Sequence, residues 1–182
     1  MAPGHSPASC RICLERLRQQ WPAFRDRVEL LLARRASRRI AGTRIVATIL
    51  KDLFTTALDW PRSCIRARLE SPTILVVTAK QMTGLVVEAR TPHSLPWDTP
   101  VIMAALHRLR TSVSEPRMKC VAISDGTRLY AAELDGDNLQ HRIYVSLVSE
   151  VPQAPLWWLS FWGIHRPNPT TPSDPPRLLP FL

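Results

Sequence analysis

The chain has 182 residues, of which 45% are hydrophobic and 21% are charged, so it is long enough to bury the core of one globular domain, with or without an appendage. Its formal net charge of +9 indicates a polyanionic partner, because neutralising phosphates contributes strongly to nucleic-acid affinity. No stretch resembles a signal peptide, and no apolar run reaches the length of a membrane span. These features exclude a membrane-spanning protein and favour a cytoplasmic one.

The N-terminal region is expected to be helical. The apolar spacing predicts one helix over residues 10–20 and a second over residues 23–35. We expect a break between them at Trp21-Pro22, because proline removes a backbone donor and restricts the residue before it. Cys10 and Cys13 have the spacing of half a zinc site, but a second pair of ligands is missing, so zinc is not expected.

Most of the positive charge lies in this region, since residues 1–39 hold nine arginines against three acidic residues. If the apolar stripes of the helices pack on the protein, their polar faces are available to a phosphate backbone. The predicted nucleic-acid contacts are Arg34, Arg35, Arg38 and Arg39. The alternative is a solvated face in a chain with 21 arginines and three lysines, a skew that a GC-rich coding sequence also produces.

The middle of the chain changes from helical to strand periodicity. A helix is predicted over residues 43–58, followed by an alternating strand over 65–70 and two β-branched runs over 73–78 and 85–88. The short turn between the two runs predicts a hairpin. A further helix is predicted over residues 101–112.

The C-terminal part reads as strands and turns. Strands are predicted over residues 120–124, 128–134 and 142–148, with Asp125-Gly126 as a hairpin turn signal. The aromatic segment 156–164 suits a helix packed on the sheet, with a platform for stacked bases as the alternative. Residues 167–182 are rich in proline and predict a disordered tail.

The fold class expected from this order is α/β, a mixed sheet flanked by helices with an α-helical N-terminal extension. The predicted division is a basic helical extension over residues 1–40, an α/β domain over 41–166 and the tail over 167–182.

The candidate site is Glu88-Ala89-Arg90, at the end of an apolar run. Residues two apart on a strand project from the same face, so the acid and the base would lie side by side. A carboxylate in such a place can bind a metal ion and a cation can polarise a phosphate, although an ordinary surface ion pair has the same pattern.

The segment from residue 49 to residue 166 resembles the PD-(D/E)XK nuclease superfamily, and most of all the N-terminal domain of type I restriction enzyme R subunits and its free-standing relatives. The matching segments are residues 51–54 and 58–61, 85–92 with Glu88-Ala89-Arg90, 121–128 with Ser124-Asp125-Gly126, and 159–167. The resemblance implies a restriction-endonuclease-like sheet and Mg²⁺-dependent hydrolysis of phosphodiesters. It also implies DNA as the expected nucleic acid, and other subunits of a restriction or defence system as partners.

The chain departs from the family's signature at two positions. Thr73 stands where the family has its metal-binding Asp, and Arg90 stands where it has Lys. Threonine is a poor Mg²⁺ ligand beside a carboxylate, and arginine does not lose its proton. Glu88 is the retained ligand, and Glu70 could supply a migrated carboxylate or be a solvated strand residue.

Three functions therefore stay open at this point. The first is a nucleic-acid-associated protein with a restriction-type fold, whose degenerate site has Glu88 and Arg90 as catalytic candidates and Glu88 and Glu70 as Mg²⁺ ligands. The second is a DNA- or RNA-binding accessory module without enzymatic activity, and the third is a structural or assembly protein of a mobile element.

Overall fold

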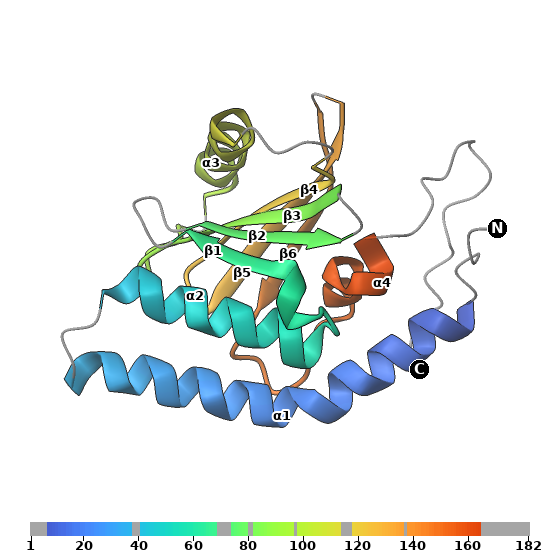
Figure 1. Ribbon diagram of the computed structural model, residues 1–182. Helices are drawn as coiled ribbons and strands as arrows, with labels where there is room; N and C mark the ends of the chain where they lie inside the picture. Colours follow the sequence, from blue (N-terminus) through green and yellow to red (C-terminus); the bar gives the residue numbers. More distant parts are fainter. Residues whose placement is uncertain are drawn as a thin grey trace.

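The structure is a computed structural model that describes residues 7–37, 41–68, 74–79, 82–96, 98–113, 118–136 and 138–164. The described part is a mixed α/β arrangement with a helical N-terminal part and an open sheet of six strands in the order β1-β2-β3-β4-β5-β6 (Figure 1). The strands are β1 Ile65–Arg68, β2 Ile74–Ala79, β3 Met82–Ala89, β4 Cys120–Ser124, β5 Arg128–Asp135 and β6 Asn138–Ser146. The α/β class predicted from the sequence is confirmed.

The sheet is mixed because one pair of neighbours runs parallel. β1, β2 and β3 form an antiparallel meander, β3 and β4 are parallel, and β4, β5 and β6 are antiparallel again. Parallel neighbours need a long crossover, which α3 (Thr99–Ser112) provides. The predicted pairing of the two β-branched runs as antiparallel neighbours is confirmed by β2 and β3.

Helices cover both faces of the sheet (Figure 1). One face carries α2 (Gly42–Asp52) with α1 (Pro7–Ser37) outside it, and α3 lies on the other. Along β3, Leu85 and Val87 belong to the apolar cluster on the α2 side, and Val86 belongs to the cluster beneath α3. All five residues of β4 are buried, as expected of a strand that is covered on both faces of the sheet.

The N-terminal region is one helix, so the predicted break at Trp21-Pro22 is wrong. α1 continues through Pro22 and is bent near its middle (Figure 1). Leu17, Trp21, Phe24 and Val28 form one buried stripe on both sides of the proline. The packing of this stripe on α2 and the segment that follows it offsets the backbone hydrogen bond that the proline removes.

Residues from α1 share a core with the sheet. Leu17 and Trp21 lie in the same apolar cluster as Leu85 and Val145. Two ion pairs also join α1 to the next elements, Arg16 to Asp59 at 2.9 Å and Arg27 to Asp52 at 3.2 Å. The boundary predicted at residue 40 stays a prediction, but the packing of α1 is that of a core element.

The other predicted elements are present with altered bounds. The helix predicted over residues 43–58 is present as α2, which ends at Asp52 and is followed directly by a π-helical turn, η1 (Leu53–Ala57). A single 3-10 turn, η2 (Arg62–Cys64), leads into β1, and β6 begins four residues earlier than predicted. The aromatic segment forms a 3-10 helix, η3 (Ala154–Leu159), and a short helix, α4 (Phe161–Ile164), rather than one helix.

The aromatic segment packs against the core. Leu156 and Leu159 are buried, and the Trp60 indole donates a hydrogen bond to the carbonyl of Leu159 at 2.8 Å. The predicted tail at residues 167–182 lies outside the described residues. Among the described helices, none combines the length and the apolar character that crossing a membrane requires.

Candidate functional site

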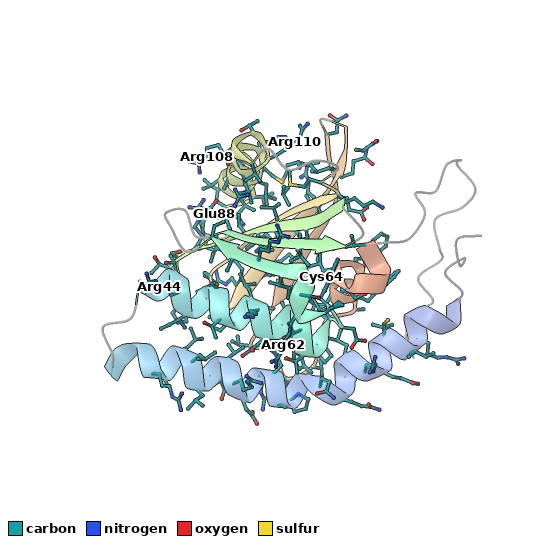
Figure 2. All side chains as sticks on the ribbon, viewed as in Figure 1. Arg44, Arg62, Cys64, Glu88, Arg108 and Arg110 are labelled. Carbon is teal, nitrogen blue, oxygen red and sulfur yellow. The ribbon has the colours of Figure 1, made fainter. Side chains whose placement is uncertain are left out.

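Glu88 and Arg90 lie where β3 ends, on the side of the sheet that α3 covers. β3 alternates its side chains, and Glu88 pairs across the parallel ladder with Ile123 of the cluster beneath α3. The backbone N–H of Arg90 donates to the carbonyl of Ser124 at 2.8 Å, which fixes the strand end to β4. Glu88 lies at the same end of the sheet as Arg44 of α2, whereas Arg62 and Cys64 lie toward the other end (Figure 2).

The two side chains form an ion pair, as their spacing predicts. The Nε atom of Arg90 lies 2.6 Å from the Oε1 atom of Glu88, and the side chains are 34% and 14% exposed, respectively. Glu88 is therefore a largely buried carboxylate whose charge is balanced by its neighbour two residues on. Such a pair is strong when little water reaches it, because screening is then weak.

A second polar centre lies beside this pair, in the turn between β4 and β5. Asp125 is completely buried, and its Oδ1 atom accepts hydrogen bonds from the backbone N–H of Thr127 (3.0 Å), the hydroxyl of Thr127 (2.8 Å) and the backbone N–H of Arg128 (2.9 Å). Its Oδ2 atom accepts from the backbone N–H of Leu95 at 3.2 Å. Asp125 is thus the turn residue that the Asp-Gly signal predicts, and Gly126 supplies the positive φ of 83° that the turn needs.

Asp125 also joins the turn to the loop after β3. The guanidinium of Arg128 donates from Nη1 to the carbonyl of Leu95 at 3.0 Å, beside the bond from Leu95 N–H to Asp125. The loop is therefore held by both its N–H and its C=O at Leu95. This network fixes the position of the segment that follows Glu88 and Arg90.

Among the described residues, no second carboxylate pairs with Glu88 across either of its ladders. Mg²⁺ takes oxygen ligands in an octahedron, but the residue across the antiparallel ladder from Glu88 is Ile74. Asp125 is completely buried, and its two oxygens already accept four hydrogen bonds. Within the described ranges, no group of three or more His, Cys, Asp or Glu side chains could hold a metal ion.

Several predicted site residues cannot be placed. Glu70 and Thr73 lie outside the described residues, as do Arg38 and Arg39. Arg34 is exposed near the C-terminal end of α1, and Arg35 follows it in the same helix. Other arginines of α1 form ion pairs within the protein: Arg16 and Arg27 as above, and Arg25 with Asp26 and Glu29.

Two tyrosines next to the site were not found from the sequence. Ile123, the ladder partner of Glu88, pairs in turn with Tyr130 of β5, which pairs with Tyr144 of β6. The two rings have centroids 4.7 Å apart and a tilt of 36°. Burial, together with the nearby Tyr144, raises the pKa of Tyr130 above its ordinary value.

One row across the sheet, on the side of α3, therefore holds Glu88, Ile123, Tyr130 and Tyr144, with Arg90 beside Glu88. It combines a paired carboxylate, a fixed cation and an exposed aromatic edge.

Comparisons with family models, with curated proteins and with solved structures give no match for this chain.

Proposed function

We propose that this chain is a nucleic-acid-associated protein with a restriction-nuclease-like fold that binds its partner without cleaving it. The observation that carries the proposal is the Glu88–Arg90 ion pair at the end of β3, with Ile74 across the ladder. The position is that of the acid-x-base signature in the family that the sequence resembles, but the carboxylate is balanced by an arginine instead of being available to a metal ion.

The order of the elements supports the fold part of the proposal. A helix, three antiparallel strands, a crossover helix and a strand parallel to the third follow one another as α2, β1, β2, β3, α3 and β4. The acid and base of the signature lie at the end of the third strand, next to its parallel neighbour. Polar residues at the carboxyl ends of parallel strands are common places for ligand binding in α/β folds.

The chemistry of arginine supports the loss of cleavage. Hydrolysis needs a group that takes a proton from water or a metal ion that lowers its pKa, and the guanidinium of Arg90 remains protonated in proteins. Arg90 can still donate hydrogen bonds to a phosphate oxygen. The site is therefore suited to holding a phosphodiester and not to breaking it.

The experiment that tests the proposal measures binding and cleavage in the same reactions. Labelled single- and double-stranded DNA and RNA are incubated with the protein with and without Mg²⁺ or Mn²⁺. We expect binding that weakens steeply with salt, because counterion release dominates phosphate contacts, and intact nucleic acid at the end. Metal-dependent cleavage that Glu88→Gln abolishes would overturn the absence of catalysis, and no binding at low salt would overturn the proposal as a whole.

The same measurement locates the phosphate contacts. Changing Arg34, Arg35, Arg38 and Arg39 together to glutamine is expected to flatten the log–log salt slope by several units, roughly one for each phosphate that is no longer neutralised. The matched control changes four exposed arginines outside α1 and removes the same charge: Arg62, Arg66, Arg68 and Arg108. Equal slopes for the two variants would mean that net charge, and not this surface, determines binding.

A further inference from the structure

A cavity of about 140 Å³ lies between α3 and the β5–β6 hairpin, outside the Glu88–Arg90 pair. α3 contributes Ile102, Met103 and Leu106, and the hairpin contributes Tyr130, Tyr144 and Arg142. Apolar cavities of about 150 Å³ accept one benzene-sized ring, so the cavity has the size of a single six-membered ring and not of a fused pair.

The chemistry of the walls fits a flat ring attached to an anion. Tyr144 is 40% exposed and its ring lies against that of Tyr130, which makes an aromatic wall that is open to solvent. Arg142, two residues before Tyr144 on β6, is exposed at the same cavity. The described residues that line the cavity include no acidic side chain. A ring can therefore enter among apolar atoms while its phosphate meets the guanidinium.

The cavity also lies on the same row across the sheet as the proposed binding site. Tyr130 is two strands from Glu88 in the same row across the sheet, which corresponds to roughly 10 Å at the usual strand spacing. A strand of nucleic acid with one base in the cavity would have its neighbouring phosphates within reach of the Arg90 end of the sheet. A base inside a duplex could not enter, because it is stacked and paired.

From these observations we propose that the cavity between α3 and the β5–β6 hairpin is a pyrimidine subsite for single-stranded nucleic acid. This inference rests on the proposed nucleic-acid function and names its ligand. The base contacts Tyr130 and Tyr144, and Arg142 binds the phosphate. The binding is selective for one ring by size, since a purine has a second ring that the cavity does not accommodate.

The experiment compares three labelled oligomers of about eight nucleotides by fluorescence anisotropy: oligo(dT), oligo(dA) and an abasic strand with the same phosphates. The abasic strand measures the phosphate contribution alone. We expect oligo(dT) to bind roughly tenfold or more tightly than either of the others. Tyr144→Ala should reduce the advantage over the abasic strand, since losing one stacked base costs between roughly fivefold and a hundredfold in affinity.

Two further variants separate the ring from the charge. Tyr144→Phe keeps the ring and is expected to keep the preference for oligo(dT). Arg142→Gln should weaken oligo(dT) and the abasic strand alike and flatten the salt slope by roughly one unit. Arg66→Gln, on β1 at the opposite edge of the sheet, removes the same charge from an exposed position and is expected to leave the oligo(dT) preference intact.

The outcomes distinguish this inference from the function on which it rests. Equal affinities for oligo(dT) and the abasic strand, unaffected by Tyr144→Ala, would overturn the subsite while nucleic-acid binding stands. Oligo(dA) binding as tightly as oligo(dT) would overturn the selection of a single ring. No binding of any of the three oligomers at low salt would overturn both proposals.

Discussion

Asp125→Ala is expected to lower the free energy of unfolding by about 3 kcal/mol or more. The side chain is completely buried and accepts four hydrogen bonds, three of them from backbone N–H groups of Leu95, Thr127 and Arg128. Alanine leaves these donors without their acceptor, and each buried donor left in that state costs about 1–3 kcal/mol. The effect is measured by denaturant unfolding followed by circular dichroism.

Two variants make this result specific. Asp125→Asn has nearly the same shape, but its amide would bring a donor to one of the positions where Asp125 accepts, so it should also destabilise the fold. Asp135→Ala, at the exposed end of β5, removes the same charge and is expected to change stability little. A loss below about 1 kcal/mol for Asp125→Ala would mean that the turn and the loop after β3 do not depend on this carboxylate.

Trp21→Ala is expected to destabilise the whole domain by about 3–5 kcal/mol, the usual cost of removing a large buried aromatic side chain. Trp21 has no exposed surface, its ring packs against Phe24, and its indole N–H donates to the carbonyl of Ser149 at 2.9 Å. The loss should appear in a single unfolding transition, because α1 and the sheet share one core.

The control for this variant is on the outer face of the same helix. Ile12 is 58% exposed, and Ile12→Ala is expected to have little effect on the transition. A Trp21→Ala protein whose sheet unfolds at the wild-type denaturant concentration would show that α1 is an independent extension. That outcome would favour the division at residue 40 that the sequence predicts.

The helices and strands were largely predictable from the sequence, because most of them have a clear period and end at turn residues. The two β-branched runs predicted β2 and β3, and Asp125-Gly126 predicted the turn after β4. The continuation of the N-terminal helix through Pro22 was not predicted, because the local preference of proline for a helix break opposes the tertiary packing there. Burial of Trp21 and Phe24 on both sides of the proline decides that competition, and burial is not visible in the local sequence.

The candidate site was predictable in part. The Glu88–Arg90 pair followed from the alternation of side chains along one strand, and the structure confirms the contact. The pairing of Tyr130 with Tyr144 did not follow. Counting back from the turn at Asp135 and Asn138 would place Ile143 opposite Tyr130, but a β-bulge between Ala131 and Glu133 shifts the register by one residue. A shift of one reverses the face on which every following side chain lies.

The central proposal, binding without cleavage, predicts that Glu88 holds no Mg²⁺, and a calorimetric titration of the protein with Mg²⁺ tests this most directly. The variant for comparison is Ile74→Asp with Arg90→Lys, which puts a second carboxylate across the ladder from Glu88, with Cβ atoms about 5 Å apart. Ile74→Asn with Arg90→Lys is the matched control, because it keeps the size of the new side chain without its charge.

The wild type is expected to give no heat of Mg²⁺ binding, and the Asp variant to bind Mg²⁺ more tightly than both the wild type and the Asn control. Circular dichroism and thermal unfolding check that all three proteins are folded. Tight Mg²⁺ binding to the wild type, lost in Glu88→Gln and not improved in the Asp variant, would contradict the account and make the Glu88–Arg90 end of β3 a metal site.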